Sequence, residues 1–147
     1  MSYILYLCLA AAAGILMAIQ GSVNGALGKI IGPWEGNLLV HAIGLLLVAL
    51  LVFVFGVGQG GFSRIREVPW YLYLGGLISV AIIFGVMTSI AQTGAAKATT
   101  AIITAQLVAA LAVETFGLFG LQQSPLTWSK GAGVLLLGIA ARLLLGK

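Results

Sequence analysis

The sequence predicts an all-α integral membrane protein with five transmembrane helices and almost no domain outside the bilayer. Hydrophobic residues make up 61% of its 147 residues and charged residues only 7%, whereas soluble domains carry about 25% charged residues. The 21 glycines fit the same environment, because membrane helices satisfy their own backbone groups and pack closely where a side chain is missing. A soluble domain of this length could not bury so much apolar surface. Residues 1–147 are therefore expected to form a single transmembrane domain.

Five apolar stretches are each long enough to cross a bilayer, which requires about 20 residues. Gly28 and Lys29, followed by the Gly32-Pro33 pair, are expected to end the first stretch. Proline suits the first position of a helix, so Pro33 introduces the second one. The five predicted helices cover residues 3–27, 34–57, 69–92, 98–119 and 125–145.

The later boundaries follow from polar and helix-breaking residues. Residues 58–69 form the longest polar connection and separate the second helix from the third. Gly94 and Lys97 predict a tight turn before the fourth helix, and Pro125 is expected to open the fifth. Tryptophan favours the membrane–water interface, and the three tryptophans support these boundaries because they fall at predicted helix starts. They are Trp34, Trp70 and Trp128.

The ends and the overall charge indicate a multi-pass protein of the cell (inner or plasma) membrane. Residues 1–13 lack the basic region of a signal peptide and are interpreted as part of the first membrane helix. The net charge of +4 indicates lipid headgroups and topology rather than nucleic acid as its counterpart. The single cysteine, Cys8, excludes an intramolecular disulfide. No catalytic or metal-binding constellation is present, so neither an enzyme nor a cofactor is expected.

Basic residues divide almost evenly between the two sides of the predicted bundle, three against four. The positive-inside rule normally requires a clear excess on the cytoplasmic side. One interpretation discounts Lys130 and Arg142, which lie inside the fifth helix, and leaves two against three. The other is that the chain inserts in both orientations and forms an antiparallel homodimer. The basic residues counted are Arg64, Arg66 and Lys130 on the N-terminal side, and Lys29, Lys97, Arg142 and Lys147 on the other.

Glycines recur along one face of the first helix, where they are flanked by the amides of Gln20 and Asn24. A smooth glycine face lets another helix approach closely. The two amides are one turn apart, so they either bond to a neighbouring helix or line a pathway. A second pair of glycines, seven residues apart in the fifth helix, is likewise expected to support helix packing or a dimer. These glycines are Gly14, Gly21, Gly25 and Gly28 in the first helix and Gly131 and Gly138 in the fifth.

The fourth helix carries a glutamine close to its middle. Gln106 shares a helix face with Thr99. Lipid cannot satisfy the four hydrogen-bonding sites of a glutamine side chain, so Gln106 is expected to face another helix or a wet cavity. An interhelical amide bond and a substrate-binding role both remain open for it.

Besides Lys130 and Arg142, Glu114 and His41 are ionisable residues inside predicted helices. Glu114 is the one acid there, since Glu35 and Glu67 sit at the interfaces, and intramembrane acids are functional candidates. It is either a proton or cation site, or a structural carboxylate that reaches the headgroups or pairs with Lys130. His41, the only histidine, is expected to be a hydrogen-bonded packing residue near an interface.

Three segments together resemble the YdcZ-like family of small proteins in the drug/metabolite transporter superfamily. They are Q-x-x-x-N-x-x-L-G-x-x-x-G at residues 20–32, AQLVAALAVETFGLFG at 105–120 and SPLTWSKGAGVLLLGIAARLLL at 124–145. The resemblance implies transport by a five-helix unit that equals half of a ten-helix transporter. Small multidrug resistance proteins carry an essential glutamate in their first helix, where this chain has Gln20 and Asn24 instead.

The sequence thus predicts a secondary transporter that moves an unknown small molecule by alternating access as an antiparallel homodimer in the lipid bilayer. Such transporters use an inverted repeat with the substrate site near the midplane. A small dual-topology ion channel and a non-transporting membrane assembly subunit are the alternatives. The predicted site or pathway residues are Gln20, Asn24, Thr99, Gln106 and Glu114.

Overall fold

The computed structural model describes residues 2–146, which form helices and connecting segments without a strand. Within these residues, five helices are long and apolar enough, by length and composition, to cross a membrane. The predicted all-α architecture with five spans is therefore confirmed. The chain divides into two compact units, Met1–Ala91 and Gln92–Lys147.

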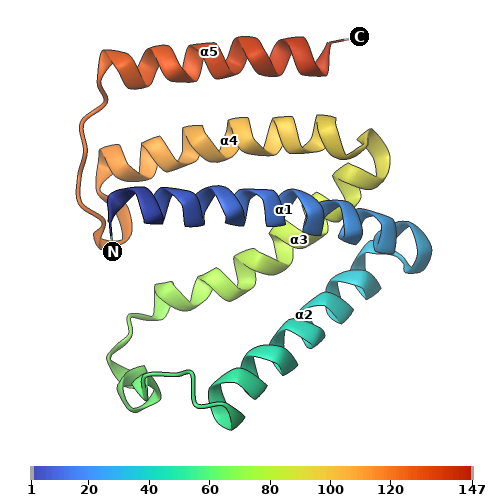
Figure 1. Cartoon of the computed structure of the whole chain (residues 1–147), viewed down its shortest axis with the longest axis vertical. Coiled ribbons are helices and arrows are strands. Elements are labelled where there is room, and N and C mark those ends of the chain that lie inside the picture. Colours follow the sequence, from blue (N-terminus) through green and yellow to red (C-terminus); the bar gives the residue numbers. More distant parts are fainter. Residues whose placement is uncertain (1, 147) are drawn as a thin grey trace. The chain divides into compact units, whose positions relative to one another are not determined.

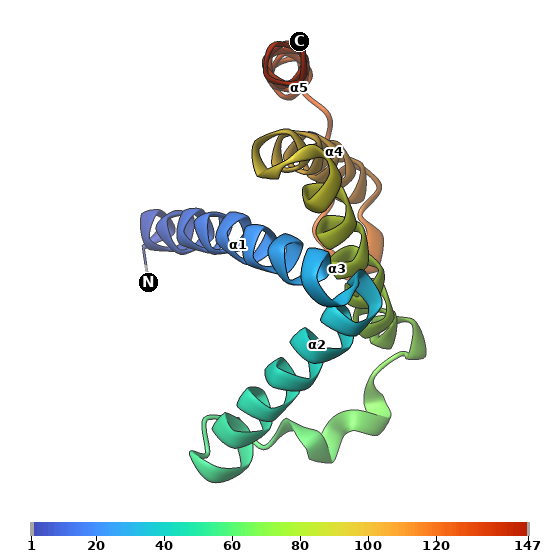
Figure 2. The same ribbon diagram turned by 90° about the vertical axis from the view of Figure 1, so that its right-hand side faces the viewer.

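The first unit contains a helical hairpin, a connection of short helices and a third long helix. Its elements are α1 (Tyr3–Ile31), α2 (Pro33–Ala49), the π-helix η1 (Leu50–Val54), the 3-10 helices η2 (Gly61–Glu67) and η3 (Trp70–Tyr73), and α3 (Leu74–Thr93), whose last two residues belong to the second unit. α1 and α2 diverge from the turn that joins them, as both ribbon views show (Figures 1 and 2).

The first helix is longer than predicted. It continues through Gly28 and ends at Ile31, where the sequence predicted an end at Leu27. Gly28 stays helical because it packs against Met87 of α3, so the glycine serves close approach rather than termination. The helix ends instead at Gly32, whose φ of +94° is accessible to glycine, and Pro33 then opens α2 as predicted.

The second and third spans agree more closely with prediction. The second span runs from Pro33 to Val54 and ends before Gly56, whose φ of +63° interrupts it short of the predicted residue 57. The third span, Trp70–Thr93, lies within one residue of the predicted range at each end. Its first turn is a 3-10 helix that follows Pro69, a residue suited to the start of a helix.

The second unit is a pair of antiparallel helices joined by a long connection. Its elements are α4 (Ala95–Phe116), the 3-10 turn η4 (Leu118–Gly120) and α5 (Trp128–Leu145). α4 and α5 pack side by side along their lengths (Figure 1).

Three predicted boundaries in the second unit are wrong. Lys97 lies within the first turn of α4, because Gly94, with a φ of +85°, already completes the turn before it. α4 ends three residues before the predicted residue 119, because Gly117 adopts the left-handed conformation typical of a helix C-terminus. Pro125 lies in the connection. α5 begins after Thr127, whose side chain caps the helix by accepting a hydrogen bond from the Lys130 backbone.

Packing in the first unit centres on two residues of α3. Met87 is fully buried and Ile90 nearly so, and both lie against the glycine face of α1. Trp34 at the start of α2 stacks on Phe84, with ring centroids 4.3 Å apart. These contacts hold the turn between α1 and α2 against α3, and they position the polar groups of α2 next to the α3 backbone.

Candidate functional site

The predicted site residues fall into two groups, one in each unit. Gln20 and Asn24 lie on α1 of the first unit, whereas Thr99, Gln106 and Glu114 lie on α4 of the second. The sequence predicts a glycine face flanked by two amides on α1, and a threonine, a glutamine and a carboxylate on α4.

The glycine face of α1 packs against α3 of the same chain. A Cβ atom built at Gly21 would lie 3.0 Å from Ile90 Cδ1, and one at Gly25 would lie 2.6 Å from Ile90 Cγ2. A Cβ atom at Gly28 would lie 2.5 Å from Met87 Cγ. These glycines therefore permit an intramolecular helix contact, as expected of small residues in membrane helices.

The other glycines predicted for packing or a dimer have open surroundings. A Cβ atom at Gly14, Gly131 or Gly138 would meet no described atom within 4 Å. Within the described chain these three positions make no close helix contact, and their role in a dimer stays a prediction.

The amides of α1 have no hydrogen-bond partner among the described residues. Asn24 is 6% exposed, and its side chain makes no hydrogen bond within the described part of the chain. Gln20, one turn earlier, is exposed and has no described partner either. Asn24 lies seven residues before the end of α1, about 10 Å along the helix axis. An unpaired amide at that depth favours contact with a polar molecule, because lipid offers no hydrogen bond.

Gln106 occupies the middle of its span, as predicted. Its span covers Ala95–Phe116, so the residue lies about 15 Å from either end. Its side chain is exposed and makes no hydrogen bond to any described residue. Thr99, two turns earlier, is half-buried and likewise has no described partner. The second unit thus leaves polar groups free at membrane depth.

Glu114 forms the ion pair with Lys130 that the sequence suggested. Glu114 Oε2 lies 3.6 Å from Lys130 Nζ, which also donates to Ser124 Oγ at 2.8 Å. The carboxylate is half exposed and lies two residues before the end of α4. An open pocket of about 520 Å³ adjoins it, lined by Glu114 and residues 121–125. This position at a helix end favours the structural alternative over a midplane proton site.

A polar cluster that the sequence reasoning missed connects α2 to α3. Asn37 is 2% exposed and donates from Nδ2 to the Val80 carbonyl oxygen at 2.8 Å. His41 Nδ1 lies 3.0 Å from the Asn37 carbonyl oxygen, and Nε2 lies 3.1 Å from Ser79 Oγ. Asn37 Oδ1 is buried and has no hydrogen-bond partner in the described chain. The sequence contains a sign of this cluster, since Asn37 and His41 are polar residues one turn apart in an apolar helix.

His41 is hydrogen-bonded, as predicted, but it lies deeper than predicted. His41 lies eight positions after Pro33, the first residue of the span Pro33–Val54. It therefore lies about 12 Å along the helix, within about 5 Å of the span's middle. It was expected near an interface because position 41 comes early in the predicted helix of residues 34–57.

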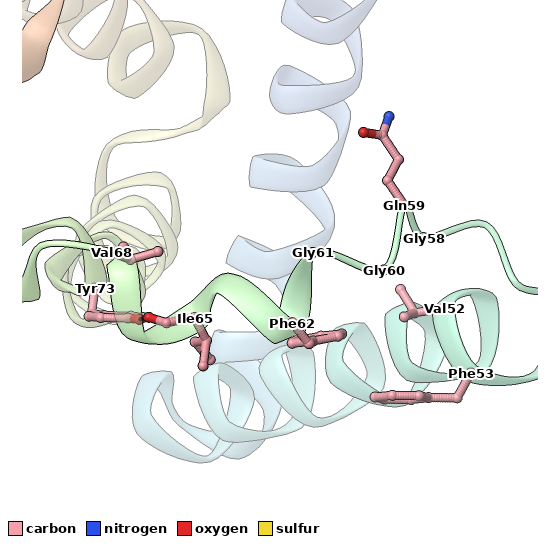
Figure 3. Close-up of a pocket in the computed structure, with 10 residues that line it drawn as sticks. All are labelled: Val52, Phe53, Gly58, Gln59, Gly60, Gly61, Phe62, Ile65, Val68 and Tyr73. Atoms are coloured by element: carbon pink, nitrogen blue, oxygen red, sulfur yellow. Dashed lines mark hydrogen bonds between the residues drawn. The ribbon is translucent and has the colours of Figure 1, made fainter.

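An apolar pocket of about 580 Å³ lies beside the connection between α2 and α3 (Figure 3). Phe53 and Phe62 stack within it, with ring centroids 5.8 Å apart. The Tyr73 hydroxyl donates to the Ile65 carbonyl oxygen, and the Gln59 side chain extends away from the other lining residues (Figure 3). The pocket thus offers few polar groups to orient a polar substrate. No three described His, Cys, Asp or Glu residues are grouped to hold a metal ion.

Comparison with known families decides the broad class of this protein. A family model described as "Putative inner membrane exporter, YdcZ" matches residues 5–143. The chain belongs to the YdcZ family. Comparisons with curated proteins and with solved structures gave no match. As a YdcZ family member with five apolar helices, the protein is a multi-pass inner membrane protein, and its family is described as an exporter.

Proposed function

We propose that this YdcZ family protein exports a small molecule by alternating access as an antiparallel homodimer. The observation that carries the proposal is the family match, which spans residues 5–143 and describes an inner membrane exporter. Unpaired amides within the membrane helices support it, because a transporter needs polar groups that a substrate can bind in place of water.

The antiparallel dimer follows from the helix number and the charge balance. Many secondary transporters are built from two inverted repeats around a midplane site. Five helices supply one such repeat, so a second copy in the opposite orientation would supply the other. The basic residues, divided three against four, leave the orientation of each copy undetermined by the positive-inside rule.

The substrate would bind near the midplane against paired polar side chains from the two copies. Gln20, Asn24 and Gln106 offer amides that both donate and accept hydrogen bonds, and Thr99 adds a hydroxyl. Glu114 belongs at the mouth of the pathway, where its carboxylate attracts cations. A neutral polar molecule or a small organic cation fits this set of groups.

Loop labelling tests the dimer orientation. In a Cys8→Ser background, Ser63→Cys places a thiol in the exposed η2 segment. A membrane-impermeant maleimide should label about half of the chains from each side of intact cells and inverted vesicles. A matched control adds two lysines after Lys147, which should force one orientation and restrict labelling to one side. Labelling of the Ser63→Cys protein from a single side would contradict the antiparallel dimer.

Flux through proteoliposomes tests transport. Radiolabelled choline and glucose serve as a cationic and a neutral probe, each measured over a range of concentrations. Saturable uptake that responds to a pH gradient would support the transporter. A flux of about thousands of ions per second or more through each protein would instead indicate a channel. An absence of uptake for a full metabolite panel would indicate an assembly subunit.

A further inference from the structure

The cluster between α2 and α3 contains the single histidine of the chain, and the predicted site does not use it. His41 contacts two groups, the Asn37 carbonyl oxygen on its own helix and the Ser79 hydroxyl on α3. Both contacts lie within the first unit, about 5 Å from the middle of the second span. The hydrogen-bonding roles of these groups determine which protonation states of the ring the site accepts.

The carbonyl contact requires a proton on Nδ1. A carbonyl oxygen can only accept a hydrogen bond, so Nδ1 of His41 must donate across the 3.0 Å contact. A neutral histidine carries one ring proton, and this contact therefore assigns it to Nδ1. Nε2 is then the free acceptor that can take a second proton.

The serine contact can form whether or not Nε2 is protonated. The Ser79 hydroxyl donates to the Gly76 carbonyl oxygen at 2.7 Å, so its hydrogen is not directed at the ring. Its oxygen can then accept from Nε2, 3.1 Å away, if the ring is an imidazolium. When the ring is neutral, rotation of the hydroxyl redirects its hydrogen from Gly76 to Nε2. One hydroxyl rotation thus accommodates both charge states.

A second, independent feature points to a ligand at the same place. Asn37 Oδ1 is buried without a donor in the described chain, one helical turn from His41. An unmatched acceptor at membrane depth favours a neighbouring hydrogen-bond donor or positive charge. A water molecule that delivers the proton provides that complement.

No charged group of α1, α2 or α3 makes a hydrogen bond or ion pair with His41 among the described residues. α3 contains no titratable side chain, and α2 contributes only Glu35 besides His41. The titratable residues of α1 make no hydrogen bond or ion pair to His41 within the described chain. They are Tyr3, Tyr6, Cys8 and Lys29. A proton taken up here is therefore not neutralised by a charged group of these three helices.

We propose that His41, positioned by Asn37 and Ser79, is a proton-binding site, and that its protonation couples substrate movement to the proton gradient. The coupling rests on the proposed transport function, whereas proton binding does not. A charge gained near the bilayer midplane changes the stability of an occluded state, which is what an exchanger needs. Glu114 suits this task less well, because it is paired with Lys130 near a helix end.

The single imidazole allows a direct test. In the full-length protein reconstituted in lipid, ¹⁵N shifts of labelled histidine report the proton on each ring nitrogen. The neutral ring should carry its proton on Nδ1, and acidification should add a second proton at Nε2. A neutral ring protonated on Nε2, or a ring that stays neutral on acidification while the protein remains folded, would overturn the proposal.

Two serine variants separate the site from a general effect on the helices. Ser79→Ala removes the hydroxyl that contacts Nε2, so the ¹⁵N shift of Nε2 should change. Ser22→Ala is the matched control, because Ser22 donates to the Ala18 carbonyl oxygen on α1 and does not contact the ring. Equal Nε2 shifts in both variants would show that Ser79 does not contact the ring.

The coupling is tested with His41→Gln in the same proteoliposomes. Glutamine keeps a hydrogen-bonding side chain of similar size but cannot gain a charge, so uptake of choline or glucose should lose its response to a pH gradient. A response equal to that of the wild type would refute coupling through His41. Wild-type protein that moves neither probe nor any metabolite of the panel would overturn the transport function, while the ¹⁵N titration would still decide whether His41 binds a proton. Helix content by circular dichroism checks that the variant is folded.

Discussion

Replacing Gly25 with alanine tests the contact between α1 and α3. The new Cβ atom would lie 2.6 Å from Ile90 Cγ2 and 3.0 Å from Ile90 Cβ. Ordinary carbon contacts are about 3.5 to 4.0 Å, so the helices must separate by about 1 Å. Ile90 cannot rotate away easily, because β-branched side chains are restricted in a helix. Overpacking of this kind costs about 1 to 3 kcal/mol.

Two further alanine variants calibrate this cost. Alanine improves helix propensity by about 1 kcal/mol over glycine at any of these positions, so the gain cancels when variants are compared. Gly14→Ala meets no described atom within 4 Å and should show the gain alone. Gly28→Ala meets Met87 at 2.5 Å, but the unbranched methionine can adjust. The expected order of stability is Gly14→Ala, then Gly28→Ala, then Gly25→Ala.

The assay is reversible unfolding in mixed micelles, followed by circular dichroism as the fraction of denaturing detergent rises. Gly25→Ala should unfold with a free energy about 1 to 3 kcal/mol below that of Gly14→Ala. Equal stability of these two variants would refute the packing of α1 on α3. A loss of dimer without a loss of monomer stability would assign the glycine face to the subunit interface instead.

Two further variants address the second unit. Glu114→Gln should lower the unfolding free energy by less than about 1 kcal/mol, because the ion pair with Lys130 is half exposed. Substrate flux through this variant should keep the wild-type response to pH. Loss of that response would make Glu114 the proton site. Gln106→Leu should raise the half-saturating concentration of the transported probe while leaving the helix content unchanged, since it removes an unpaired amide in the middle of the span without leaving a charge behind. Unchanged uptake kinetics in Gln106→Leu would place that side chain outside the pathway.

Composition and hydrophobic length were sufficient to predict the membrane class and the five spans. Both are local properties, because each helix satisfies its own backbone and its length is matched to the bilayer. The helix ends were harder to predict, since glycines occur both inside these helices and at their ends. Gly28 and Gly32 look alike in the sequence, but Met87 lies against the first and the second turns the chain.

The partners of the polar groups depended on tertiary structure. Asn37 and His41 stand out only weakly in an apolar helix, and their partners Ser79 and Val80 lie about 40 residues away in the chain. Hydropathy contains no information about which helix faces cross, so the cluster could not be assembled from the sequence. The glycine face was recognisable by its period, but only the crossing of α1 and α3 identified Ile90 as its neighbour. The hydrophobicity and length of each segment thus determined the spans, whereas side-chain packing between helices decided which groups meet inside them.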